Sequence, residues 1–326
     1  MYWQLRRMRL VYVSLLMVSL LLPALVPQMV QAQQFPNKPV IVVLGMPTGG
    51  TADFPARLLS SVAVDYLGQP MILQFKPGGS GTIANNYVMN SKPDGYTLLF
   101  GSTMNNSMIP AIEDKPGGPG DLVTVSRITY LPSLLIANID APFKTFKEML
   151  AWAKTNPGKM TYGHTGVWGA ADLFWRQVKK ETGIVTRDVP HTGVGPIITA
   201  LIGGHIMVSC INAAGAMPYI EAGKVRALAV MDSQRYPTLP NVPTGKEEGV
   251  DINSFMWLGI LAPKATPRGI IDQLDVAIKK MAEDKFFVET LKKLGQDVGY
   301  MGPDEFDRFW RNEYEYYKEL GKTFKK

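Results

Sequence analysis

The sequence predicts an α/β protein of two lobes, each a mainly parallel sheet flanked by helices. Short runs of β-branched and aromatic residues alternate with segments of helical periodicity along the chain. The alternation begins near residue 40, meets a glycine- and proline-rich break at residues 116–120, and resumes after Asp140. Two such sets of elements pack most naturally as two lobes, and 326 residues are enough for both.

The composition is that of a globular protein. Apolar residues make up 46% of the chain and charged residues 19%, which excludes an intrinsically disordered chain. The single cysteine excludes both a scaffold held by disulfides and a zinc module with four cysteines.

The first 32 residues are predicted to be a signal peptide. Three arginines precede an apolar run over residues 10–26, and Val30 and Ala32 suit a signal peptidase that cuts after Ala32. A membrane anchor is disfavoured because the run is shorter than the ~20 residues of a spanning helix, and Pro23 and Pro27 interrupt its end. No cysteine stands directly after the run, where a lipid anchor would be attached.

The charge of the predicted mature chain is nearly balanced. Without the three arginines of the signal peptide, 31 of the 34 basic residues remain beside 28 acidic residues, a net charge of +3. The lysines are scattered and mostly lie near acidic residues, which is typical of solvated helix faces. We therefore expect no nucleic acid as a partner.

The first set of elements begins with a strand over residues 40–44. A helix is predicted over residues 51–66, because apolar side chains recur there every four residues. Further strands are predicted at residues 71–75 and 96–100. This order of strand, helix and strand favours parallel pairing.

The second set begins with a helix capped by Thr145, where Glu148 completes a capping box. Near the C-terminus, Thr266 is the predicted cap of another helix, and an aromatic stripe on the last helix is expected to pack in the core. The other predictions are strands at residues 160–162, 206–211 and 225–231, and helices at residues 170–181, from Pro267 and after Pro303.

The loop after the first predicted strand has the features of an anion site. Gly49 and Gly50 let the backbone approach a ligand, and the hydroxyls of Thr48 and Thr51 accompany the free N–H groups of the first helical turn. Asp53 is either a partner of the helix dipole or a ligand contact. The loop lacks both glycine-rich nucleotide motifs, so no nucleotide is expected.

Two later loops have the same character. Residues 163–170 follow a strand and precede a helix, and residues 190–195 form a similar turn. Ligands of open α/β sheets bind outside the carboxyl ends of the strands. Two lobes with facing anion sites predict a clamshell that closes on a small acid.

No catalytic or metal site is predicted. The sequence has no G-x-S-x-G and no H-E-x-x-H motif, and Cys210 lies in an apolar strand where a buried, inert thiol is expected. His164 and His191 lack an obvious third ligand for a metal, so they are expected to donate hydrogen bonds to a bound acid. We expect neither an enzyme nor a cofactor.

Ten motifs in order resemble one known family. They are F-P-N-K-P-V (35–40), P-T-G-G-T-A-D (47–53), L-G-Q-P (67–70), K-P-G-G-S-G (76–81), K-P-D-G-Y-T-L-L-F-G (92–101), N-P-G-K (156–159), V-P-H-T-G (189–193), A-L-I-G-G (200–204), I-E-A-G-K-V-R-A-L-A-V (220–230) and L-P-N-V-P-T (239–244). The chain is similar to the extracytoplasmic solute receptors of tripartite tricarboxylate transporters, the Bug family.

The resemblance implies a periplasmic, two-lobed binding protein of the type II Venus-flytrap fold. Such a receptor, expected here as a monomer, captures an organic acid, partly through bridging waters, and delivers it to a membrane permease of two subunits. A sensing adaptor for a membrane signalling protein would share these features, whereas a secreted hydrolase lacks its nucleophile. The implied ligand-binding residues are Thr48, Gly49, Gly50, Thr51, Asp53, Thr103, His164, Thr165, Gly166, Val167, Trp168, His191, Thr192 and Asn212.

The chain departs from the family pattern at three loops, in the first of which Thr51 or Ala52 stands where a third glycine is usual. Val167 and Trp168 stand where small polar residues are typical, and Thr192 stands where a cation is common. We therefore expect a ligand with an apolar or aromatic portion beside its carboxylate. The alternative is that Trp168 packs beneath its loop.

The family's two crossings between lobes are expected at residues 123–138 and after Val230. These positions assign residues 33–133 and 233–326 to the first lobe and residues 134–232 to the second. Closure on a ligand would then be a hinge motion at the crossings.

Overall fold

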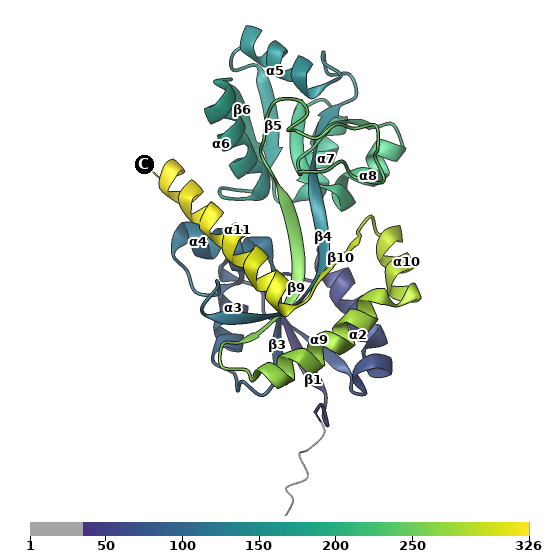
Figure 1. The fold of residues 1–326 in the computed structure, drawn as a ribbon. Coiled ribbons are helices and arrows are strands. Elements are labelled where there is room, and N and C mark those ends of the chain that lie inside the picture. The colour runs from purple at the N-terminus through teal and green to yellow at the C-terminus, as the bar shows by residue number, and fades with distance from the viewer. Residues whose placement is uncertain (1–34, 326) are drawn as a thin grey trace, which may run out of the picture. The chain divides into compact units, whose positions relative to one another are not determined.

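The computed structural model describes residues 35–325, so the predicted signal peptide lies outside the described residues. Strands and helices alternate from Val40 onward (Figure 1), and the predicted bounds agree with the observed ones to within two residues. The elements up to the first long strand are β1 (Val40–Leu44), α2 (Asp53–Leu67), β2 (Met71–Phe75), the 3₁₀ turn η2 (Gly79–Gly81), α3 (Thr82–Met89), β3 (Thr97–Ser102), the π-helical turn η3 (Met104–Met108), α4 (Ile109–Glu113) and β4 (Leu122–Asn138).

The second part of the chain continues the alternation and ends in a long helix. Its elements are α5 (Phe146–Thr155), β5 (Met160–His164), α6 (Ala170–Thr182), β6 (Thr186–Pro190), α7 (Val194–Ile202), β7 (Val208–Asn212), α8 (Ala213–Glu221), β8 (Val225–Val230), β9 (Phe255–Pro263), α9 (Arg268–Glu283), α10 (Lys285–Lys293), β10 (Val298–Met301) and α11 (Pro303–Phe324). Within residues 35–325, no helix is both long and apolar enough to span a membrane.

The strands pair in the order β2-β1-β3-β9-β4-β7-β5-β6, with β8 and β10 also pairing with β4. The pairs β1–β2, β1–β3, β5–β6 and β5–β7 are parallel, which confirms the predicted α/β class. The long strands β4 and β9 instead pair antiparallel with their neighbours. This antiparallel centre was not predicted from the sequence.

Strand β4 belongs to two half-sheets (Figure 1). Its residues 122–132 pair with β9, and its residues 133–138 pair with β7 and β8. We call the part with β1, β2, β3, β9 and β10 the first half-sheet, and the part with β5, β6, β7 and β8 the second. The ligand loops predicted from the sequence follow strands of both halves.

Each half-sheet has its own aromatic core. On the first, Trp257 packs edge-on against Phe306 and Trp310, with ring centroids 5.0 and 6.4 Å apart. On the second, Tyr162 stacks on Trp175 with centroids 5.0 Å apart. Burial of rings on this scale is the main apolar contribution to stability, and it gives each half an independent core.

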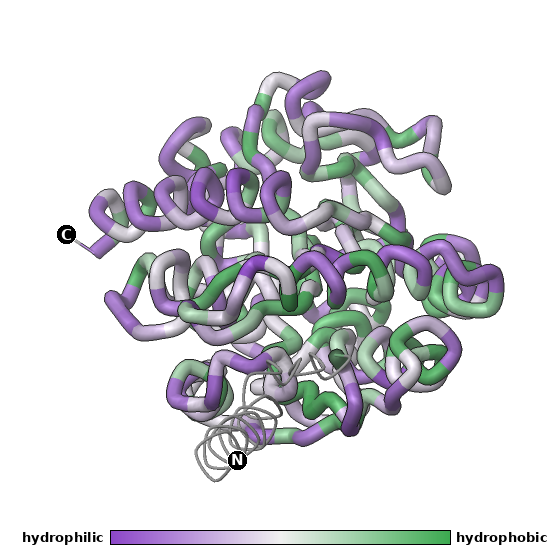
Figure 2. Tube along the Cα trace, turned by 60° about the horizontal axis from the view of Figure 1, so that its bottom comes forward, coloured by the Kyte–Doolittle hydropathy of each residue, from purple (hydrophilic) through white to green (hydrophobic). Residues whose placement is uncertain are grey.

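The C-terminal helix α11 is amphipathic, as its aromatic stripe predicted. Phe306, Trp310 and Tyr317 are buried, whereas hydrophilic residues cover much of the helix that runs to the C-terminus in Figure 2. The stripe therefore packs against the core, as expected.

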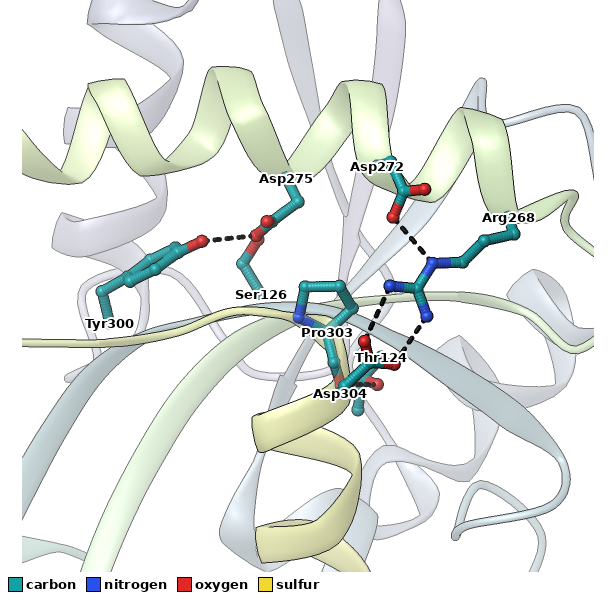
Figure 3. A network of polar contacts seen from close by, with 8 residues as sticks. All are labelled: Thr124, Ser126, Arg268, Asp272, Asp275, Tyr300, Pro303 and Asp304. Carbon is teal, nitrogen blue, oxygen red and sulfur yellow. Dashed lines mark hydrogen bonds and ion pairs between the residues drawn. The ribbon is translucent and has the colours of Figure 1, made fainter.

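A polar network fixes α9 and the start of α11 against β4 (Figure 3). Asp275 accepts hydrogen bonds from the hydroxyls of Ser126 (2.6 Å) and Tyr300 (2.8 Å). Arg268 pairs with Asp272 at 2.7 Å and holds Asp304 with two guanidinium nitrogens, at 2.6 and 2.8 Å. The part-buried contacts of Asp275 fix the helix position, whereas the exposed arginine pairs contribute less.

Of the two helix caps predicted from the sequence, the one at Thr145 is observed and the one at Thr266 is not. The Thr145 hydroxyl accepts from the Glu148 N–H (3.1 Å), which confirms the first half of the predicted capping box. Thr266 was predicted to cap α9, but its hydroxyl donates to the Pro263 carbonyl (2.7 Å) and the helix begins at Arg268. The preceding turn is tight enough for a local hydroxyl-to-carbonyl bond to compete with the cap.

Candidate functional site

Residues from both half-sheets line a cavity of about 170 Å³. Three methionines and several aliphatic side chains give it a mostly apolar wall, so we call it the methionine cavity. Its polar side chains are neutral, and no lysine, arginine, aspartate or glutamate lines it. The lining residues are Thr103, Met104, Met108, Ser133, Thr165, Gly169, Ala170, Ala171, Val194, Ile197, Cys210, Ile211, Asn212, Phe255 and Met256.

A second cavity, of about 240 Å³, shares Val194 and Asn212 with the first. Two glycines of the β1–α2 loop and Gly215 of α8 line it, so we call it the glycine cavity. Its full lining is Gly49, Gly50, Thr51, Phe54, Val194, Asn212, Ala214, Gly215, Leu294 and Gln296. The two cavities therefore adjoin at the end of β7 and the start of α7.

The loop between β1 and α2 lines the glycine cavity and carries unpaired backbone donors. Gly49, in the left-handed region with φ of +78°, donates its N–H to Asp53 Oδ2 at 2.7 Å. The N–H groups of Gly50 and Thr51 donate to no protein acceptor within residues 35–325. Two free N–H groups beside a helix N-terminus form the kind of anion site that the sequence predicted.

Asp53 closes this loop. Its carboxylate is 4% exposed, accepts the Gly49 N–H and pairs with Arg57 Nε at 2.7 Å. These contacts account for the aspartate without a ligand. Of the two interpretations left open by the sequence, the arrangement favours a structural one.

The loop between β5 and α6 uses the same device. Asp172 accepts the N–H of Trp168, four residues before it, at 2.9 Å and pairs with Arg176, four residues after it, at 2.8 Å. The corresponding residues of the first loop are Gly49, Asp53 and Arg57. Each loop is thus shaped by a buried carboxylate at the first turn of its helix, independently of any bound molecule.

Trp168 lines neither cavity. It adopts φ of +62°, a conformation that is strained for a bulky residue, and the Arg176 guanidinium lies 4.8 Å from its ring centroid. Its ring packs against a cluster that contains Met108 and Tyr317. Val167, beside it, is 62% exposed and lines neither cavity.

The two histidines contact protein groups. His164 is buried; its Nδ1 accepts the Gly166 N–H at 3.2 Å and its Nε2 lies 3.4 Å from Asp188 Oδ2. Its carbonyl accepts the His191 N–H at 2.9 Å. Within residues 35–325, no cluster of three histidine, cysteine or acidic side chains can hold a metal.

The predicted site residues therefore fall into two groups. Those that line a cavity are Gly49, Gly50, Thr51, Thr103, Thr165 and Asn212. Those that line neither of these two cavities are Thr48, Asp53, His164, Gly166, Val167, Trp168, His191 and Thr192.

Asn212 is the residue of the first group that belongs to both cavities. Its Oδ1 accepts the Gly215 N–H at 3.0 Å and caps α8. A backbone N–H can only meet the oxygen of the amide, so the Nδ2 end is the end left over. Within the described chain, Nδ2 donates to no protein acceptor, which leaves it available to a ligand.

A buried carboxylate stands behind the wall of the methionine cavity. Glu313 Oε2 accepts hydrogen bonds from the Ser107 hydroxyl (2.5 Å) and the Trp257 indole N–H (2.6 Å). Thr103, which lines the cavity, accepts the Trp257 backbone N–H at 2.9 Å. Burial raises the pKa of Glu313 to about 7, although these donors and Arg127 oppose the shift.

Cys210 is buried, as predicted, although it lines the methionine cavity. Burial raises the pKa of its thiol to about 12, so the neutral form prevails at neutral pH. It therefore contributes to the cavity as a small apolar group.

Sequence reasoning missed several lining residues. Met104 and Met108 lie in a π-helical turn, and Phe255 and Met256 open strand β9. Neither segment has a glycine-rich signal, and only the three-dimensional fold brings them to the loops. Gln296 follows Gly295, whose φ of +69° marks a helix end that the sequence could have suggested.

Comparisons with known proteins identify the family of this chain. The family described as "Tripartite tricarboxylate transporter family receptor" matches residues 56–324. A Cupriavidus necator protein, "UPF0065 protein in gbd 5'region", is 34% identical over 88% of this chain and 87% of its own. BugT of Bordetella pertussis is 30% identical over 87% of this chain and 88% of its own.

Solved structures of related proteins share the fold. A TctC solute-binding protein from Polaromonas has a TM-score of 0.80 and 30% identity, covering 89% of this chain and 100% of its own. MatC of Rhodopseudomonas palustris with bound malate has a TM-score of 0.73 and 27% identity, covering 88% and 100%. R. palustris Rpa4515 with adipate has a TM-score of 0.76 and 26% identity, covering 89% and 98%. The chain described here belongs to the TctC family of tripartite tricarboxylate transporter receptors, the Bug-type solute-binding proteins.

Proposed function

We propose that this protein is a periplasmic receptor that captures a small organic acid between two lobes and passes it to a two-subunit membrane permease. The observation that carries the proposal is the pair of adjoining cavities, which residues of both half-sheets line. The malate and adipate bound to two related structures support a carboxylate as ligand. Family membership supports the permease and the periplasmic location.

The carboxylate binds to neutral donors at the glycine cavity. The N–H groups of Gly50 and Thr51 and the Nδ2 amide of Asn212 lack protein acceptors. A hydrogen bond to a charged group contributes about 1.5–3 kcal/mol, and a well-held water bridges any remaining gap at little cost. No lysine or arginine lines either cavity, so a single carboxylate suits the site better than a highly charged acid.

The rest of the ligand lies in the methionine cavity. Its apolar wall favours a hydrocarbon or aromatic portion, which gains about 0.8 kcal/mol for each buried methylene group. Methionine side chains adapt to ligands of different outline. We therefore retain the apolar portion predicted from the sequence, with Met104, Met108 and Met256 in place of Trp168 as its contacts.

The lobes correspond to the two half-sheets. We place the first crossing within β4, at the residues 123–138 expected from the sequence. Tyr236, Val250 and Ile252 pack into the core clusters of the second half-sheet, so we place the second crossing near residue 254 and extend the second lobe to about residue 253. Closure bends the chain at these two crossings.

The proposal is tested by calorimetric titration of the purified protein with a series of organic acids. We expect saturable binding of one acid per chain and recovery of the acid unchanged, since a receptor does not turn its ligand over. A ligand at a hundred times its dissociation constant should also raise the free energy of unfolding by about 2.7 kcal/mol. Absence of binding across mono- and dicarboxylates with and without apolar chains would refute the receptor function.

Delivery and location need cellular experiments. Sequencing the N-terminus of the protein recovered from the periplasm should find residue 33 first. Deletion of the gene should abolish uptake of the ligand identified by titration, while unaltered uptake would argue for a sensing role instead.

A further inference from the structure

The glycine cavity contains two amide side chains with fixed and opposite orientations. Asn212 directs its oxygen to the Gly215 N–H, at 3.0 Å, so its NH₂ group is the end that remains. Gln296 donates its Nε2 to the Thr51 carbonyl, at 3.0 Å, so its oxygen is the end that remains. A carbonyl accepts only from the NH₂ group and a backbone N–H donates only to the oxygen, so neither amide can be reversed.

The remaining oxygen of Gln296 is an unpaired buried acceptor. The residue is 3% exposed and lines the glycine cavity, and its Oε1 has no hydrogen-bond donor within the described residues. Buried polar atoms are nearly always paired in folded proteins, so an unpaired one at a cavity calls for a donor from elsewhere.

The loop that carries Gln296 is held in place. The hydroxyl of Tyr236 donates to Asp297 Oδ2 at 2.6 Å. Gly295 approaches Ala214 so closely that an added Cβ would lie 3.2 Å from its Cα. Gln296 is therefore positioned relative to α8, and both Gln296 and Asn212 line the glycine cavity.

We propose that Asn212 and Gln296 form a donor–acceptor pair that selects acids carrying a neutral group able both to donate and to accept, namely a hydroxyl or a carboxamide. This inference rests on the proposed function and names a specificity-determining residue, Gln296, for the same site. A second carboxylate would satisfy the Asn212 donor but repel the Gln296 oxygen. An ammonium group would satisfy the oxygen but oppose the Asn212 NH₂.

For such an acid, the ligand's own carboxylate lies at the two backbone N–H groups alone, and Asn212 is no longer one of its donors. The free N–H groups of Gly50 and Thr51 offer donors without an accompanying acceptor, so they suit the carboxylate. When the hydroxyl or carboxamide occupies the amide pair, Asn212 serves that group and the two N–H groups hold the carboxylate.

The test compares acids that share a carbon skeleton. Succinate is paired with malate, glutarate with 2-hydroxyglutarate, butyrate with 3-hydroxybutyrate, and succinate with its monoamide, succinamate. Dissociation constants are measured by calorimetry for the wild type, for Gln296→Met and for Gln273→Met, an exposed glutamine on α9 that serves as the matched control.

The wild type and the control should bind the substituted acid about tenfold more tightly than its parent in at least one pair, the equivalent of one additional well-made hydrogen bond. In Gln296→Met this preference should fall below twofold. Preference in the hydroxy pairs or in the succinamate pair then identifies which of the two groups the site takes.

Two outcomes would overturn the inference while the receptor function stands. The wild type binds parent acids with no preference in any pair, or Gln296→Met weakens both members of a pair by the same factor. The second result would mean that Gln296 only holds Thr51 in place. If no acid binds at all, the proposed function fails and the inference fails with it.

Discussion

Substitution of the buried Glu313 by glutamine should change how stability depends on pH. Its folded pKa of about 7, against 4.5 ordinarily, means that the folded chain keeps a proton that the unfolded chain has released. The free energy of unfolding therefore falls as pH rises from about 4.5 to about 7 and is constant above that window. The shift corresponds to about 3 kcal/mol, and glutamine, which is always neutral, avoids this loss.

The assay is urea unfolding of the wild type and Glu313→Gln, followed by circular dichroism at pH values from 4.5 to 8. The two proteins should have similar stability near pH 4.5, and the variant should be more stable by up to about 3 kcal/mol at pH 8. Glu315→Gln, an exposed glutamate on the same helix, controls for the loss of a charge. If the free energies of unfolding of the wild type and the variant differ by the same amount at every pH in this window, burial does not raise the pKa of Glu313.

Three further predictions concern the loops. If the hydroxyl of Thr51 binds the anion, Thr51→Val should weaken binding of the acid by about 1–3 kcal/mol in calorimetry. Thr48→Val should change the affinity less, because Thr48 lines neither cavity. Equal losses of affinity in the two variants would contradict this placement. Asn212→Asp should retain stability, because aspartate caps helices as well as asparagine, but lower acid affinity at least thirtyfold by placing a like charge at the cavity; unchanged affinity would exclude Asn212 from the site. Asp172→Ala should lower the free energy of unfolding by about 2–4 kcal/mol in urea, because it strands the Arg176 guanidinium and the Trp168 N–H; a loss below 0.5 kcal/mol would show that the loop is shaped by other contacts.

Local patterns predicted the elements because the interactions that form them are local. The strands at residues 40–44 and 71–75 and the helix that starts at Ala170 agree with the structure, since periodicity and turn residues determine them within a few positions. The antiparallel pairing of β4 with β9 joins residues more than a hundred positions apart, and no local pattern encodes it.

Site residues could likewise be predicted where a local sequence pattern marks them. Gly49, Gly50 and Thr51 could be found because a glycine-rich turn between a strand and a helix has a physical signature. The helix end before Gln296 was recognisable, but the contributions of Met256 and Gln296 to the cavities were not, since they depend on which distant segments the fold brings together. For Trp168, the sequence identified the loop but not the direction of the ring. That direction depends on a left-handed backbone and on contact with a cluster that contains Tyr317 from α11.

The two aspartates that shape the loops make the structure of each loop independent of ligand specificity. Asp53 and Asp172 set the curvature of the backbone from within and touch neither pocket. Cavity residues such as Met104 or Gln296 can therefore be replaced, and the ligand can change, while the loops keep their conformation. Receptors with this arrangement can share one fold and bind different ligands with little loss of stability.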